Sequence, residues 1–270
     1  MFELRKIESF ELPELQPYRT MRRQQEQRDQ GIFVAEGEKV VRRLLESRLA
    51  VVSVLLPEKW LASYEPLLQA RREEIQVFIA EKKLLETLTG FSMYQGLLAI
   101  GKVPPPVSLE RILVESVRPR LLAAVDRLAS AENIGALVRN CAGFGAHALI
   151  VGETSGSPYL RRAVRNSMGT VFQLPIVETG NLAGALRELR AHGVRCVAAH
   201  PHTDRKTISQ ADFTSDVCVV FGSEGDGISA AVLAECDEAV AIPMPPMVDS
   251  LNVGAAAAVF LYEARRQRGT

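Results

Sequence analysis

The chain has 270 residues, of which 47% are hydrophobic and 24% are charged, a composition typical of folded globular proteins and not of disordered ones. Its formal net charge is zero, which excludes a global basic field that would attract nucleic acid or an anionic membrane. Charged residues interrupt the amino-terminal stretch, and no apolar run approaches the ~20 residues of a spanning helix. These features predict a cytoplasmic protein without a membrane partner.

The cysteines predict no metal site and no disulfide framework. They are widely spaced, form no CxxC pair and have no histidine nearby at ligand spacing. We therefore expect small buried side chains in a reducing compartment. They are Cys141, Cys196, Cys218 and Cys236.

The first hundred residues predict a small α/β domain. Residues 37–48 have the spacing of an amphipathic helix, with Val40, Val41, Leu44 and Leu45 on one stripe. Helical patterns also cover residues 61–74 and 81–89, and short β-type runs cover 51–56 and 76–79. A basic cluster precedes them, and as an isolated pattern it favours a solvated helix face. It comprises Arg19, Arg22, Arg23 and Arg28.

Three consecutive prolines, Pro104 to Pro106, mark the expected domain boundary. Such a run cannot continue a helix or a central strand and favours an extended spacer. We expect one domain over residues 1–103, a linker over 104–118 and a second domain over 119–270.

The second domain alternates apolar strands with helices, which is typical of a mostly parallel sheet covered on both faces. Strands are predicted at 121–125, 148–151, 195–199, 217–221 and 239–242. Helices are predicted from about 133, at 182–191, at 228–236 and from about 249 to 266. Ligands of such sheets bind beyond the carboxyl ends of the strands, so the loops there are the candidates for chemistry.

The first of these loops leads into a helix that contains Asn133 and Arg139. Asn133 occupies an expected N-cap position, and capping alone could explain it. Arg139 lies off the buried stripe, near the expected amino-terminal end of the helix and on the ligand side. A surface salt bridge is the simpler explanation for an isolated arginine.

The second loop, residues 222–229, reads GSEGDGIS. Glycines at the end of a strand allow backbone to approach a ligand closely, and carboxylates can hold hydroxyl or amino groups. A tight turn explains the same pattern equally well.

The third loop, residues 242–254, reads IPMPPMVDSLNVG and runs into an alanine-rich helix. Asp249, Ser250 and Asn252 are residues that cap helices. The stiff apolar run from Met244 to Met247 could also form a wall for a flat or thioether-bearing ligand.

In combination, the motifs N-x5-R, GSEGDGIS and IPMPPMVDSLNVGAA, in this order, resemble the SpoU (TrmH-type) branch of the SPOUT RNA methyltransferases. The resemblance covers residues from about 121 to the carboxyl terminus, and residues 162–176 resemble the family's link between the first two motifs. It implies a deep trefoil knot in the parallel α/β domain, which general rules of topology make improbable.

The resemblance implies S-adenosylmethionine-dependent methylation of a ribose 2′-hydroxyl in structured RNA, with ribosomal RNA favoured over transfer RNA. It also implies a homodimer and no metal. The implied catalytic residues are Arg139, Asn133, Glu224, Ser250 and Asn252. The implied cofactor-binding residues are Gly222, Ser223, Ile242, Met244, Leu251 and Asn252.

The amino-terminal motif R-x-x-G-x-F-x-x-E-G, from Arg28 to Gly37, is similar to that of the L30e-like substrate-binding domain found in several SpoU enzymes. This resemblance turns the interpretation of the basic residues towards RNA, since phosphate contacts dominate nucleic-acid affinity. The implied RNA-binding residues are Arg19, Arg22, Arg23, Arg28, Lys39, Arg161, Arg162 and Arg165.

The chain departs from the family pattern at Pro246, where glycine is usual, and at Gly254, where serine is usual; Pro246 removes a backbone donor. The main alternative is a catalytically silent RNA-binding protein on the same fold. A nucleotide-dependent oxidoreductase lacks the early GxGxxG that it needs. A metal hydrolase would have to use His200, His202 and Asp204, and no further ligands lie at suitable spacing.

Overall fold

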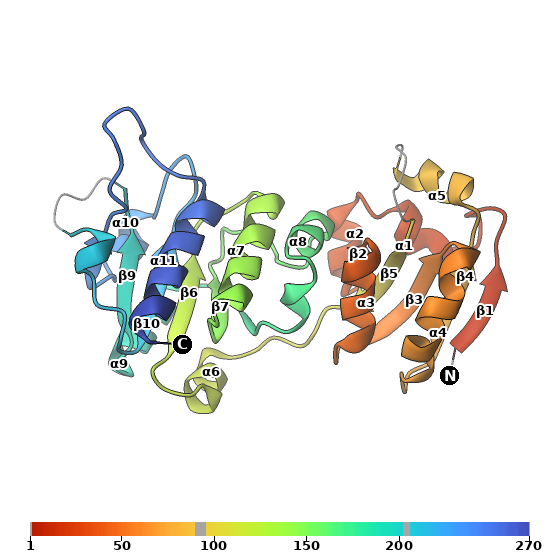
Figure 1. The fold of residues 1–270 in the computed structure, drawn as a ribbon, viewed down its shortest axis with the longest axis horizontal. Helices are drawn as coiled ribbons and strands as arrows, with labels where there is room; N and C mark the ends of the chain where they lie inside the picture. Colours follow the sequence, from red (N-terminus) through yellow and green to blue (C-terminus); the bar gives the residue numbers. More distant parts are fainter. Residues whose placement is uncertain (1, 90–95, 202–205, 270) are drawn as a thin grey trace. The chain divides into compact units, whose positions relative to one another are not determined.

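The computed structural model describes residues 2–89, 96–201 and 206–269. The chain forms two compact units (Figure 1). The first comprises Met1–Pro105 together with Tyr159–Phe172, and the second comprises Pro106–Pro158 together with Gln173–Thr270. The first unit thus includes a segment that lies far along the chain from the rest of it.

The first unit contains a five-stranded mixed sheet in the order β1-β4-β3-β5-β2. Strands β1, β4 and β3 run parallel, whereas β5 is antiparallel to both of its neighbours. The sequence predicted β3 and β4 but not the other three strands. The strands are β1 (Phe2–Lys6), β2 (Ile32–Glu36), β3 (Val51–Leu56), β4 (Ile75–Ile79) and β5 (Leu98–Lys102).

Short helices accompany this sheet. The predicted apolar stripe of α3 is buried, because Val40, Val41, Leu44 and Leu45 face the core. The helices are α1 (Gln16–Arg19), α2 (Gln24–Asp29), α3 (Glu38–Glu46), α4 (Leu61–Gln69), α5 (Lys82–Thr89) and α8 (Arg161–Asn166).

The segment Tyr159–Phe172 is fixed to β2 by aromatic and ionic contacts. The ring of Phe33 lies 5.6 Å from that of Tyr159 and 5.4 Å from that of Phe172. The buried carboxylate of Glu36 accepts hydrogen bonds from Arg161, at 2.6 Å, and from Arg165, at 3.4 Å. A buried carboxylate needs charged or hydrogen-bonding partners, and the two arginines supply them to Glu36. These contacts explain why the segment Tyr159–Phe172 belongs to the first unit.

The second unit contains a six-stranded sheet in the order β11-β9-β10-β6-β7-β8, with all neighbouring strands parallel. This confirms the predicted α/β fold with a parallel sheet. Four strands have the predicted bounds, β11 is shorter than predicted, and β8 was not predicted. The strands are β6 (Leu121–Val125), β7 (Ala148–Val151), β8 (Ile176–Glu178), β9 (Arg195–Ala199), β10 (Val217–Phe221) and β11 (Glu238–Val240).

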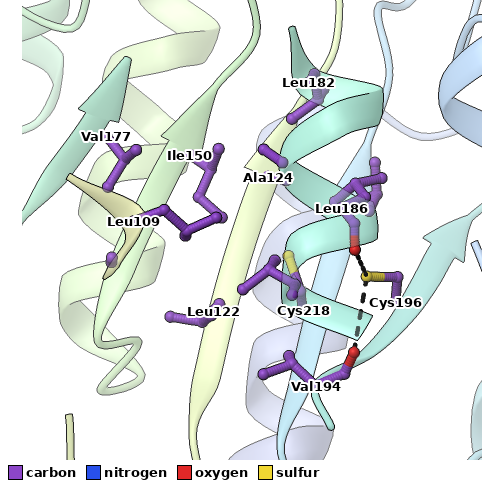
Figure 2. Close-up of a cluster of buried hydrophobic side chains, with 14 of the residues drawn as sticks. Leu109, Leu122, Ala124, Ile150, Val177, Leu182, Leu186, Val194, Cys196 and Cys218 are labelled. Carbon is purple, nitrogen blue, oxygen red and sulfur yellow. Dashed lines mark hydrogen bonds between the residues drawn. The ribbon is translucent and has the colours of Figure 1, made fainter. Parts of the chain in front are cut away.

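Helices α6 (Leu109–Glu115), α9 (Leu182–Ala191) and α10 (Ala230–Leu233) contribute to the core on one face of this sheet. Figure 2 shows part of that core, including Leu109, Leu122 and Cys218. The linker predicted over residues 104–118 thus contains a helix, because Leu109, Ile112 and Leu113 give it an apolar face to bury.

Helices α7 (Ala131–Gly143) and α11 (Val253–Gln267) pack closely against each other. A Cβ atom on Gly254 would lie 3.0 Å from the Cβ of Ala136, and Asn140 donates a 2.6 Å hydrogen bond to the carbonyl of Gly254. The glycine that departs from the family pattern therefore lies where two helices nearly touch.

A buried ion pair lies where β6 and β10 begin, at the amino ends of the strands. Asp216 accepts hydrogen bonds from the backbone N–H of Arg120, at 2.8 Å, and from its guanidinium, at 2.7 Å. The guanidinium of Arg268, just after α11, donates to backbone carbonyls in the same region, including that of Ser215. These contacts fasten the end of the last helix to the base of the sheet.

Candidate active site

A cavity of about 210 Å³ lies at the carboxyl ends of β9, β10 and β11. Its walls come from residues 221–228, from the ends of β9 and β11, and from the segment that enters α11. This is the edge where a parallel sheet places its ligands.

Residues 222–228 form a compact loop, here called the glycine loop. Ser223 and Gly227 exchange backbone hydrogen bonds of 3.2 and 3.1 Å, and Gly227 has a φ of 65°. The hydroxyl of Ser223 accepts a hydrogen bond from the backbone of Asp226 at 3.1 Å. A Cβ atom on Gly222 would lie 2.2 Å from the carbonyl carbon of Gly227. Only glycine at position 222 therefore allows the two arms of the loop to close.

Asn133 joins the three predicted motifs. Its side-chain amide donates a hydrogen bond to Glu224 in the glycine loop, and its oxygen accepts one from Asn252 at 3.0 Å. The side-chain oxygen of Asn252 in turn caps α11 by accepting from the N–H of Gly254. The side chains of Asn133, Glu224 and Asn252 are therefore brought together.

The prediction that Asn133 caps its helix is wrong. Helix α7 begins at Ala131, and its cap is Ser130, whose hydroxyl accepts from the backbone of Asn133 at 3.3 Å. Because Ser130 satisfies the helix end, the amide of Asn133 is available for Glu224 and Asn252.

The placement of Arg139 near the amino-terminal end of the helix is also wrong. It is the ninth of the thirteen residues of α7, about 9 Å along the axis from Asn133. Its side chain is exposed and does not line the cavity. Among the residues that the structure describes, it has no hydrogen-bonding or ionic partner.

The last helix begins at Val253 and not near Asp249, because Asn252 caps it. Residues 241–252 are consequently an extended loop, in which Met244, Ser250 and Leu251 line the cavity. Most of the polyproline part is solvent-exposed, and Met247 is 95% exposed. The apolar wall predicted for this loop is therefore formed by Met244 and Leu251 rather than by Met247.

The residues predicted to bind the cofactor gather at this cavity, with the exception of Asn252. The lining members are Gly222, Ser223, Ile242, Met244 and Leu251. Of the residues predicted to be catalytic, Glu224 and Ser250 line it as well. Ala199 and Phe260 also line the cavity and were not predicted, and His200 was expected only as a metal ligand of the alternative hydrolase. The position of Ala199 and His200 at the end of a predicted parallel strand was the signal that could have identified them.

The side chains that line the cavity are mainly apolar, and the charged ones are carboxylates. Phe221, Ile228 and Phe260 supply apolar surface, whereas Glu224 and Asp226 supply negative charge. No lysine or arginine of the described part of the chain lines it. This charge distribution favours a cationic ligand with an apolar portion over one rich in phosphate.

The residues predicted to bind RNA lie in the first unit and have differing environments. Arg161 is committed to Glu36, with its side chain 14% exposed, whereas Lys39 is exposed. In the amino-terminal cluster, Arg19 lies 3.7 Å from Glu11 and Arg23 lies 2.8 Å from Glu26. The exposed members are Arg19, Arg22, Arg23, Arg28, Lys39 and Arg162.

The described residues contain no group of His, Cys, Asp and Glu side chains that could hold a metal ion. His202 and Asp204, which a metal hydrolase would need, lie outside those residues. The same ranges contain no helix with the length and apolar character needed to cross a bilayer. Burial raises the pKa of the Cys141 and Cys196 thiols to about 12, as expected for packed rather than reactive cysteines.

Comparison with known proteins connects this geometry to one family. The model of the SpoU rRNA Methylase family matches residues 120–262. An uncharacterized tRNA/rRNA methyltransferase from Mycobacterium tuberculosis is 31% identical over 240 residues, which cover 87% of this chain and 81% of that protein. A similarly named protein from Mycobacterium bovis is 30% identical over 239 residues with the same coverage.

Solved structures agree over nearly the whole chain. The SpoU methyltransferase AviRb from Streptomyces viridochromogenes is 28% identical, with a TM-score of 0.80 and coverage of 94% of this chain and 96% of that one. Its complex with AdoMet matches with a TM-score of 0.81, at 28% identity, over 94% and 97% of the two chains. An RNA 2′-O ribose methyltransferase is 26% identical, with a TM-score of 0.79 over 100% of both chains.

Proposed function

The chain belongs to the SpoU rRNA Methylase family, and from this premise we propose that it methylates a ribose 2′-hydroxyl of structured RNA. The proposed methyl donor is S-adenosylmethionine, and we favour ribosomal over transfer RNA as the substrate. The observation that carries the proposal is the meeting of the glycine loop, the end of β11 and the segment before α11 at one cavity.

The residues of the cavity fit the proposed donor. Its sulfonium is a cation, which the carboxylate of Glu224 favours, and its adenine suits the apolar walls. The missing side chain of Gly222 lets the glycine loop close against Gly227, and the closed loop forms one wall of the cavity. When bound, the donor supplies an electrophilic methyl group. The residues that would hold it are Gly222, Ser223, Ile242, Met244 and Leu251.

The chemistry requires a poorly acidic hydroxyl to attack in line and to lose its proton. Arg139 cannot accept that proton, because a guanidinium stays protonated in proteins. Its proposed role is to clamp the adjacent RNA phosphate and the hydroxyl, while phosphate or water accepts the proton. Asn133 and Glu224 shape the site through their hydrogen bond, and Ser250 and Asn252 hold the nucleotide or the loop.

We further propose a homodimer in which Arg139 acts at the partner's cavity. Arg139 is exposed and does not line the cavity of its own chain. Helix α11 packs against α7, the helix that carries Arg139. It exposes apolar side chains to solvent, with Val259 38% and Tyr262 56% exposed. A second copy covering this face would bury that surface and bring Arg139 near a second cavity.

The family resemblance also supports a knotted second unit and an RNA-binding role for the L30e-like first unit. Exposed basic side chains there, such as Lys39 and Arg28, are available for phosphate contacts.

The experiment that tests the proposal combines calorimetry with transfer of a labelled methyl group to ribosomal and transfer RNA. We expect binding of S-adenosylmethionine and incorporation at a 2′-hydroxyl, read as resistance of one linkage to alkaline cleavage. Arg139→Ala should abolish transfer and leave cofactor affinity nearly unchanged. Failure of the wild-type protein to bind the cofactor would favour the alternative, a catalytically silent RNA-binding protein.

A further inference from the structure

Asp126, the residue directly after β6, contacts both ends of the glycine loop. Its backbone N–H donates to the carbonyl of Phe221, just before the loop, at 2.9 Å. Its side-chain carboxylate accepts from the backbone N–H of Ser229, just after the loop, at 2.7 Å. One residue of a neighbouring strand therefore closes the base of the loop.

The carboxylate that makes this contact is buried, because Asp126 is only 4% exposed. Away from water, losing this acceptor leaves the backbone N–H of Ser229 unsatisfied. Within the loop, Ser223 and Gly227 bond to each other, whereas Glu224, Gly225 and Asp226 are exposed. The tip is held by the hydrogen bond of Glu224 with Asn133 and by the ion pair of Asp226 with Arg127, whereas Asp126 holds the base.

We propose that Asp126 is a positioning residue for cofactor binding: its carboxylate fixes the base of the glycine loop, so that Gly222 and Ser223 present their backbone to the cavity. This inference rests on the proposed function, because the proposed function assigns the cavity to S-adenosylmethionine. Asp126 does not itself line the cavity and acts through Ser229.

A second contact from the same strand end holds the loop tip more weakly. Arg127 donates a 2.6 Å hydrogen bond to Asp226, but their side chains are 36% and 72% exposed. Solvent screening makes such exposed pairs contribute little. We therefore assign the positioning to Asp126 and expect Arg127→Ala to change cofactor affinity by less than about threefold.

The test compares Asp126→Ala with Asp216→Ala. Both residues are buried carboxylates that accept a backbone N–H, but Asp216 does so at the opposite end of the strands. In Asp126→Ala we expect the dissociation constant for S-adenosylmethionine, measured by calorimetry, to rise about tenfold or more. Asp216→Ala should lower the unfolding temperature and leave that constant unchanged. Equal cofactor affinities in the two variants would overturn the proposal.

Conservative variants cover the case in which Asp126→Ala does not fold. Asp126→Asn keeps an acceptor at the same reach and should bind the cofactor more tightly than Asp126→Glu, whose extra methylene moves the carboxylate. The reverse order would overturn the assignment, because charge alone would then matter.

Hydrogen exchange separates this inference from the proposed function. The hydrogen-bonded amides of Ser223, Asp226, Gly227 and Ser229 should exchange at least about tenfold faster in Asp126→Ala or Asp126→Glu than in the wild type, and should be unchanged in Asp216→Ala. This holds whether or not the wild type binds the cofactor, so absent binding refutes the proposed function alone. Unaltered exchange in the Asp126 variants would refute the positioning role alone.

Discussion

Gly222 provides the sharpest test of the cavity, because a single methyl group there must open the glycine loop. A Cβ atom at this position would lie 2.2 Å from the carbonyl carbon of Gly227, and 2.4 Å from the backbone nitrogen of Ile228. Ordinary van der Waals contact begins near 3.4 Å. The two arms of the loop must therefore separate by about 1 Å, since both colliding atoms belong to the backbone and no side chain can move aside.

A displacement of about 1 Å at a binding site can cost about a hundredfold in function, and overpacking of this kind costs about 1–3 kcal/mol of stability. We expect Gly222→Ala to raise the dissociation constant for S-adenosylmethionine about tenfold to a hundredfold, as measured by calorimetry.

Gly225→Ala is the matched control for this variant. Gly225 lies in the same loop, but a Cβ atom there would have no neighbour within 4 Å. Its affinity should stay within about twofold of the wild type, and its stability should be equal or slightly higher. Indistinguishable cofactor affinities for Gly222→Ala and Gly225→Ala would refute the reasoning that a closed loop forms the binding wall.

The remaining predictions concern stability. Asp216→Ala should cost about 3–5 kcal/mol in urea denaturation, because it leaves the Arg120 guanidinium buried and unpaired; replacing both residues by apolar ones should recover most of that loss. The free energy of unfolding should fall between pH 9 and 12, because burial keeps the Cys141 and Cys196 thiols protonated up to about 12 while unfolded thiols ionise near 9. In alkaline denaturation, the free energy of unfolding should fall by up to ~1.4 kcal/mol per pH unit for each thiol. Replacing a cysteine by alanine should remove its share of this pH dependence. Glu36→Ala should destabilise the first unit by about 2 kcal/mol in thermal unfolding, whereas substitution of an exposed glutamate should not.

Strands β6, β7 and β10 of the second unit could be predicted well because each is a continuous run of buried apolar residues, whereas the short β8 was not predicted. The bounds of β6, β9 and β10 agree with the sequence-based ones. In the first unit, β1 has charged residues at most positions and β5 ends in glycine and lysine, so neither has a clear apolar period. Their pairing depends on partners far along the chain, which local patterns do not reveal.

The candidate site could be predicted in part, because glycines and polar residues at strand ends indicate which loops bind a ligand. The contacts between those loops could not be predicted. Asn133 was expected to cap a helix, and only the geometry shows Ser130 in that place and Asn133 bonded to Glu224 and Asn252. Asp126 bonds to Phe221 and Ser229, far along the chain, and no local pattern reveals those contacts.

The segment Tyr159–Phe172 belongs to the first unit although it lies within the sequence of the second. The protein therefore cannot be divided into its two units by a single cut in the chain. A cut at the prolines near position 105 would leave the rings of Tyr159 and Phe172 without Phe33, and Arg161 without Glu36. Chimaeras that exchange the amino-terminal part between relatives should therefore also exchange this later stretch, or keep its partners on β2 matched. Evolution would be expected to change both stretches together.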